Sequence, residues 1–103
     1  MFTNFERVKL GLMPLASNAQ LDAAANAKVM DMFAQQYFEH VSPLGVDAAD
    51  VVGGAGYAYL AIGENLALGN FKDDAALIAA WMASPGHKAN IVSSKYAEIG
   101  VAV

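Results

Sequence analysis

The chain has 103 residues, of which 56% are hydrophobic, so it has the length of one domain and enough apolar side chains to bury a core. Six basic and ten acidic residues give a formal net charge of -4, and the basic residues are scattered, which excludes the basic footprint of a nucleic-acid-binding protein. The absence of cysteine excludes a disulfide framework, a zinc ribbon and thiol catalysis.

Neither a membrane anchor nor an export signal is expected in this chain. Polar and charged residues interrupt every apolar stretch well before the roughly 20 residues of a membrane span. Residues 1–7 form an amphipathic run with an acidic residue, whereas a signal peptide has a basic region before an apolar core.

The first half of the chain predicts two helices. Apolar residues at helical spacing predict a short helix over residues 3–10. Ser17 and Gln20 have the spacing of a capping box, which predicts a long helix from this point to about Phe38. The apolar stripe of this helix contains one charge, Lys28; its other members are Leu21, Ala24, Ala25, Val29, Met32, Phe33 and Tyr37. Residues 41–56 are loop-rich and leave room for a short helix around residues 47–52.

The second half predicts two strands and two helices. Residues 58–68 alternate as in a strand, and Glu64 shares the apolar face with four aliphatic side chains. Asp73 and Asp74 suit the start of a helix that ends before Pro85. Ser84 suits the N-cap, and Pro85 the first position, of a further short helix that continues to residue 92. Residues 97–103 alternate and predict a final strand.

Three side chains are candidates for chemistry: His40 just after the long helix, Glu64 on the apolar strand face, and His87 in the first turn of a helix. Imidazoles and a carboxylate are ligands that zinc or a similar divalent cation takes. Their separations of 24 and 23 residues match no compact metal motif, so the alternative is that each histidine is a partly exposed polar residue and that Glu64 bonds to backbone. Asn65 and Asn90 are expected to make hydrogen bonds that either orient these residues or satisfy loops.

Other kinds of site have less support. Ser84 lacks the setting of a serine nucleophile and is explained as a helix cap. The glycines of residues 53–56 lack the strand before them and the Lys-Ser or Lys-Thr pair after them that a phosphate-binding loop needs.

Several motifs in a fixed order resemble the CAP superfamily of cysteine-rich secretory, antigen five and pathogenesis-related proteins, and its bacterial SCP-domain branch in particular. They are NFER (residues 4–7), GLMPL (11–15), YFEHVSP (37–43), GENLA (63–67), WMASPGHKANI (81–91) and EIGVAV (98–103). The resemblance covers essentially the whole chain, which would form a single domain over residues 1–103.

This resemblance implies an α+β fold, namely an α-β-α sandwich with a small, mostly antiparallel sheet between helical layers. The family lines its central cavity with two histidines and two acidic residues that bind divalent metal in several members. His40, Glu64 and His87 match three of these positions, while Ser84 stands at the second acidic one, so weaker metal binding is expected. Family members usually continue past residue 103 with one more strand, so we expect the last strand to be missing here.

The functional expectation is a monomeric, extracellular or cell-surface binding module. His40, Glu64 and His87 would hold a divalent cation, with zinc the best candidate, in a cleft that Ser84, Asn65 and Asn90 help to line. The ligand would be an unidentified small molecule, lipid, glycan or peptide. The first alternative is a metal-assisted, peptidase-like hydrolase with Glu64 as candidate general base. The second is that the three polar side chains only bond loops around the sheet.

Overall fold

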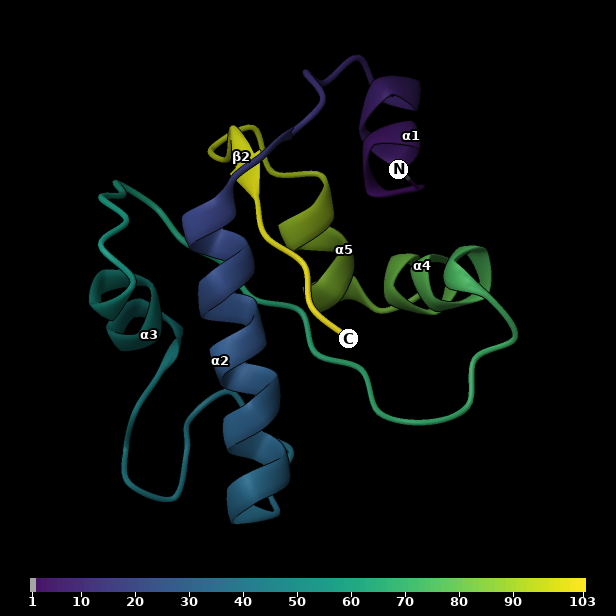
Figure 1. Cartoon of the computed structure of the whole chain (residues 1–103). Coiled ribbons are helices and arrows are strands. Elements are labelled where there is room, and N and C mark those ends of the chain that lie inside the picture. Colours follow the sequence, from purple (N-terminus) through teal and green to yellow (C-terminus); the bar gives the residue numbers. More distant parts are fainter. Residues whose placement is uncertain (1) are drawn as a thin grey trace.

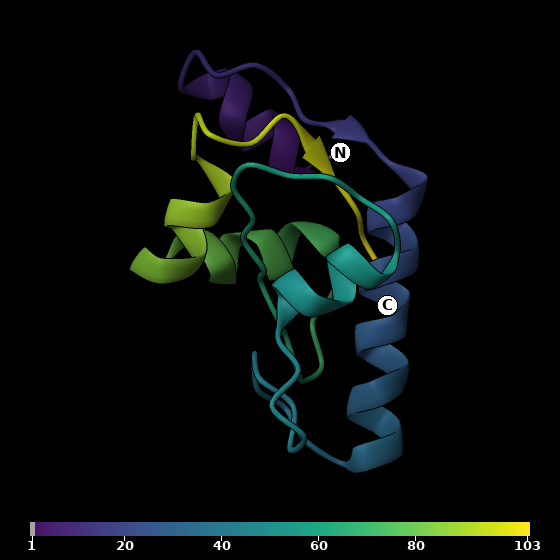
Figure 2. The ribbon, with the colours of Figure 1, turned by 90° about the vertical axis from the view of Figure 1, so that its left-hand side faces the viewer.

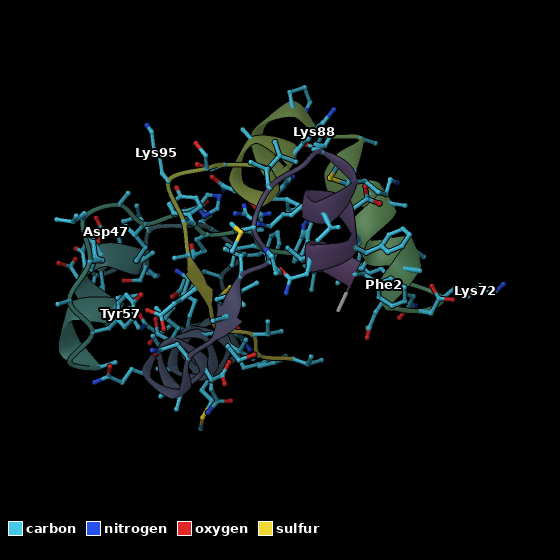
Figure 3. The ribbon with its side chains drawn as sticks, turned by 90° about the horizontal axis from the view of Figure 1, so that it is seen from above. Phe2, Asp47, Tyr57, Lys72, Lys88 and Lys95 are labelled. Atoms are coloured by element: carbon cyan, nitrogen blue, oxygen red, sulfur yellow. The ribbon has the colours of Figure 1, made fainter. Side chains whose placement is uncertain are left out.

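The computed structural model describes residues 2–103 and is rich in helix, which confirms the α+β class. Its elements are α1 (Phe2–Lys9), β1 (Ala16–Ser17), α2 (Ala19–Gln35), α3 (Ala48–Gly54), α4 (Asp74–Met82), α5 (Pro85–Ile91) and β2 (Glu98–Ile99). α3 packs against α2 on one side of the molecule, and α1, α4 and α5 pack together on the other (Figure 1). Seen from above, Asp47 and Tyr57 lie on the first side, and Phe2 and Lys72 on the second (Figure 3).

α2 begins one residue later than the capping box predicts. Asn18 is its N-cap, and the side chain of Asn18 accepts a hydrogen bond of 3.0 Å from the Leu21 amide. Ser17 is not the cap because the backbone of Asn18 is still extended, with φ -136° and ψ 125°, so that the helix begins only at Ala19. The helix ends at Gln35, before the predicted end at Phe38, because Gln36 turns into the left-handed region with φ 54°. The helix around residues 47–52 is confirmed as α3, with a capping box between Asp47 and Asp50.

The sheet is smaller than the sequence predicts, and its pairing is parallel rather than antiparallel. It consists of β1 and β2, in which Ala16 is opposite Glu98 and Ser17 is opposite Ile99. The strand predicted at 58–68 is wrong: this segment has no ladder partner within residues 2–103, and Leu60 at its start is fully exposed. The strand predicted at 97–103 shrinks to β2 because the chain then leaves the ladder, and the Val101 amide donates to the Asp22 carboxylate at 2.9 Å.

A buried arginine joins the first helix to the end of the last one. Arg7 is 2% exposed, and its guanidinium donates to the carbonyl oxygens of Met13 and Ile91 at 2.9 Å, of Ser93 at 2.7 Å and of Tyr96 at 3.3 Å. Because Ile91 ends α5, the positive charge lies where the helix presents unpaired carbonyls. Arg7 therefore holds α5 in place relative to α1.

The apolar stripe predicted for α2 is confirmed only in part. Ala24 is buried as predicted, whereas Phe33 is 78% exposed. Lys28, the only charge of the stripe, is 4% exposed and is the second buried cation of the described chain. No helix within residues 2–103 has both the length and the apolar character needed to cross a membrane.

Candidate functional site

Side chains from three distant segments line one pocket of about 250 Å³. Its residues are His40, Glu64, Asn65, Ser84, Gly86, His87 and Asn90. All six residues that the sequence singled out for a cleft are among them. The sequence analysis did not single out Gly86, although its position directly before His87 could have indicated that it lines the same pocket.

The fold brings these segments together around the irregular stretch of residues 57–73. This stretch runs from α3 on one side of the molecule to α4 on the other (Figure 1) and carries Glu64 and Asn65. His40 follows the end of α2, in a segment that leaves the lower end of that helix and turns back toward α3 (Figure 2). α5 contributes His87 and Asn90 from successive turns.

His40 and Glu64 form the closest polar contact of the pocket. Nδ1 of His40 lies 2.8 Å from Oε1 of Glu64, although the side chain of His40 is 61% exposed and that of Glu64 is 18% exposed. A carboxylate can only accept a hydrogen bond, so Nδ1 carries the proton. In a neutral ring, Nε2 then holds the free lone pair. Carboxylates orient metal-binding histidines in this way in many proteins.

His87 has a different partner, namely the hydroxyl of Ser84. Nδ1 of His87 lies 3.0 Å from Oγ of Ser84, and the imidazole stacks on Trp81 with ring centroids 6.1 Å apart. Ser84 occupies the N-cap position as predicted, but its side chain makes no capping hydrogen bond. The prediction of Ser84 as a side-chain cap is therefore wrong, because its hydroxyl is directed at His87 and not at the amides of the first turn.

Asn65 and Asn90 tie the glutamate segment to α5 through backbone carbonyls, which is the loop-satisfying role, and neither bonds the side chain of Glu64 or His87 within residues 2–103. The Asn90 amide donates to the Glu64 carbonyl at 3.0 Å and to Oδ1 of Asn65 at 2.9 Å. The Asn65 amide in turn donates to the His87 carbonyl at 3.1 Å. Gly63 permits this close approach, because a Cβ there would lie 2.7 Å from the Tyr96 hydroxyl and 3.0 Å from Oδ1 of Asn90. In the GEN motif, the glycine thus leaves space for the neighbouring side chains, the glutamate lines the pocket, and the asparagine connects this segment to α5.

The donor chemistry of the pocket suits zinc, but its side chains are not arranged as a ready-made site. Within residues 2–103, no group of three or more His, Asp or Glu side chains is placed to hold a metal ion. Glu64 is engaged as the partner of His40. No hydrogen bond reaches Nε2 of His40 or of His87 from this part of the chain, so these two atoms are the nitrogen donors that an ion could use.

A second hollow, of about 270 Å³, lies between α2, residues 37–46 and α3 and contains none of the predicted site residues. Its side chains Lys28, Asp31, Gln35 and Tyr37 are already bonded to one another. Tyr37 donates to Asp31 at 2.5 Å and accepts from Nζ of Lys28 at 3.2 Å. The one signal in the sequence that pointed to this cluster was Lys28, the single charge on the apolar stripe of α2.

Two bacterial proteins are similar to this chain in sequence. The uncharacterized protein YkwD of Bacillus subtilis (strain 168) is 40% identical over 99 residues, which make up 96% of this chain and 38% of that protein. The uncharacterized membrane protein YlbC of the same strain is 33% identical over 101 residues, or 98% of this chain and 29% of that protein. The chain thus spans only about a third of the length of these relatives.

Two solved structures share the fold. An extracellular protein containing an SCP domain, from Bacillus anthracis str. Ames, superposes with a TM-score of 0.90 at 30% identity, over 98% of this chain and 34% of that one. An outer surface protein of Borrelia burgdorferi superposes with a TM-score of 0.87 at 21% identity, over 96% of this chain and 72% of that one. The profile of the cysteine-rich secretory protein family, CAP, matches residues 2–103. This chain therefore belongs to the CAP family.

Proposed function

We propose that this CAP domain is an extracellular binding module whose pocket holds a divalent cation, zinc first of all, together with a ligand. The observation that carries the proposal is that two imidazoles in one pocket each have Nδ1 engaged, His40 by Glu64 and His87 by Ser84. Both rings are thereby oriented, while Nε2 of each receives no hydrogen bond from residues 2–103. Two oriented imidazole nitrogens with open positions for water or ligand are a basis for a zinc site.

The extracellular location rests on the kinds of protein that share this fold. One is an extracellular protein with an SCP domain and the other is an outer surface protein. A chain without cysteine needs neither a reducing nor an oxidising compartment, so its composition is compatible with export.

Each residue of the pocket has a distinct part in this proposal. The Glu64 carboxylate accepts a hydrogen bond from Nδ1–H of His40 and so keeps the lone pair of that ring on Nε2. Ser84 fixes the orientation of the His87 ring, and Trp81 covers one face of it. Because Ser84 replaces a second carboxylate, the site is less negative. It should therefore bind the cation weakly, and it leaves the bound cation free to attract an anionic group of the ligand. A bound zinc ion would supply the positive charge for that group.

The proposal is tested by isothermal titration of the metal-stripped chain with zinc at neutral pH. We expect one ion per chain with a dissociation constant in the micromolar range. His40→Ala and His87→Ala should abolish binding, and Glu64→Gln should weaken it by about 10- to 100-fold, the usual effect of losing a carboxylate that orients a metal-binding histidine. Glu39→Gln is the matched control, because this exposed neighbour of His40 lies outside the pocket.

Equal affinity in the wild type and all four variants would contradict the proposal, as would no binding by the wild type. Turnover of peptide or ester substrates by the zinc-loaded wild type, lost in Glu64→Gln, would replace the binding role by a hydrolase.

A further inference from the structure

The segment that carries His40 has little to hold it in place. Gln36, in the left-handed region, ends α2, and the next backbone hydrogen bond after that of Tyr37 runs from the Ser42 amide to the Val46 carbonyl at 2.9 Å. Within the described chain, residues 38–41 make no backbone–backbone hydrogen bond. Packing contributes little, since Phe38 is 41% exposed and Val41 is 48% exposed.

One side chain compensates for this lack of backbone pairing. The ammonium of Lys28 donates a hydrogen bond of 3.0 Å to the carbonyl oxygen of His40. Across residues 2–103, this is the only hydrogen bond to the main chain of residues 38–41. Lys28 reaches this carbonyl from the middle of α2, which is the longest helix and a rigid support.

The cluster of Lys28, Asp31 and Tyr37 holds the ammonium in place. Nζ of Lys28 also donates to the Tyr37 hydroxyl at 3.2 Å and lies 4.7 Å from the centroid of that ring. The Tyr37 hydroxyl donates to Asp31 at 2.5 Å. Desolvation, and then the hydrogen bond to Asp31, raise the pKa of Tyr37 to about 12, so the hydroxyl keeps its proton for Asp31 and offers its lone pair to Lys28.

Burial of this ammonium is hard to explain by stability alone. A buried ammonium loses its hydration, and an apolar side chain of similar length often serves the fold equally well. What a methionine could not do at position 28 is donate a hydrogen bond to His40. Among residues 38–41, the group to which Lys28 donates a hydrogen bond is the carbonyl of His40, the residue whose ring meets Glu64.

We propose that Lys28 is a positioning residue for the pocket: its buried ammonium fixes the peptide of His40 and thereby sets the ring against Glu64. This inference rests on the proposed function of the pocket and adds a residue that does not line it. Lys28 contacts no ligand; it acts through His40.

The absence of cysteine allows a test in which the same position carries side chains of matched shape. Lys28→Cys introduces a single thiol, which is alkylated in the unfolded chain before refolding. An aminoethyl group restores a lysine-like ammonium, and a propyl group supplies the same length without charge. Lys28→Met, which is expressed directly, provides a second uncharged side chain at this position without a refolding step. Ring nitrogen NMR reports the tautomer of His40, and calorimetry reports zinc affinity.

We expect the aminoethyl protein to match the wild type in both measurements. The propyl protein and Lys28→Met should lose the single Nδ1–H tautomer of His40 and bind zinc at least about tenfold more weakly, as for other residues that orient a metal ligand. Wild-type tautomer and affinity in either folded neutral variant would overturn the inference. If the wild type binds no zinc, the proposed function fails, while the tautomer measurement still decides the role of Lys28.

Discussion

Ser84 stands at the N-cap of α5, yet its hydroxyl lies 3.0 Å from Nδ1 of His87 instead of capping a backbone amide. The first turn of α5 therefore lacks a side-chain acceptor for its amides, and the pocket gains an oriented imidazole. In the family pattern that the sequence resembles, an acidic residue occupies this position. The same position thus bears on the stability of the helix and on the charge of the pocket.

Ser84→Asp is expected to stabilise α5 and to tighten zinc binding in the pocket. A carboxylate at the N-cap accepts hydrogen bonds from backbone amides and interacts favourably with the helix dipole. The free energy of unfolding measured in urea should therefore rise by about 0.5–1 kcal/mol. The added negative charge should tighten zinc binding by about tenfold, equivalent to about 1.4 kcal/mol. Ser84→Asn is the matched control, because asparagine caps equally well without charge. If Ser84→Asn tightened zinc binding as much, charge would not be the cause.

Arg7→Lys is expected to destabilise the fold by about 3 kcal/mol, because lysine keeps the charge but cannot reach the four carbonyls that the guanidinium now satisfies. Urea unfolding followed by circular dichroism measures this loss. Lys9→Met on the same helix is the control, because Lys9 is exposed and its ion pair with Glu6 at 3.3 Å should contribute less than about 1 kcal/mol. Similar losses in both variants would show that Arg7 is not the anchor of α5.

Gly100→Ala is expected to destabilise the chain by about 1–3 kcal/mol, because a Cβ at this position would overlap the backbone of Leu21 and Asp22 in the first turn of α2. Gly53→Ala is the matched control. A Cβ at Gly53 meets nothing within 4 Å, and alanine has the higher helix propensity, so this change in α3 should stabilise by up to about 1 kcal/mol. Thermal unfolding should therefore shift in opposite directions, and a shift in the same direction would contradict the close approach.

Tyr37 should make the fold sensitive to alkali. Its pKa is raised to about 12 from 10.0, by desolvation first and then by the hydrogen bond to Asp31. A raised pKa means that the neutral hydroxyl is favoured in the folded state. This contribution to stability is complete below about pH 10 and is lost as the pH rises toward 12.

The measurement is an ultraviolet titration of tyrosinate in the wild type and in Tyr37→Phe. The difference between the two curves should be centred near pH 12, and the stability advantage of the wild type over Tyr37→Phe should shrink above pH 10. A difference curve centred near pH 10 would show that Tyr37 is not bonded as described.

The local sequence predicted the helices well because their signals are local. Periodicity and capping residues identified α4 and α5, Pro85 gave the start of α5, and the breaks around residues 41–56 left room for α3. The strand predicted at 58–68 failed for the opposite reason. Alternation shows that one face is apolar, but a strand exists only if another strand pairs with it, and no other part of the described chain does so.

The candidate site was predicted in composition but not in arrangement. His40, Glu64 and His87 were found as polar residues at unusual places and by resemblance to a family, and they line one pocket. Which atoms bond was not accessible, because the partners of His40 and His87 depend on side-chain directions. Lys28 was visible only as a charge on an apolar stripe, and nothing in its neighbours pointed to the His40 carbonyl.

The sequence by itself determined the approximate helical segments, the family and all pocket residues except Gly86, because periodicity, capping and motif order are carried by residues close together in the chain. The tertiary structure alone decided the parallel pairing of β1 with β2, the burial of Arg7 and Lys28, and the choice of Glu64 and Ser84 as partners of the two histidines. Most of these contacts join residues far apart in sequence, so they form only when the chain folds, whereas the contact of Ser84 with His87 lies within one helical turn and depends on side-chain direction.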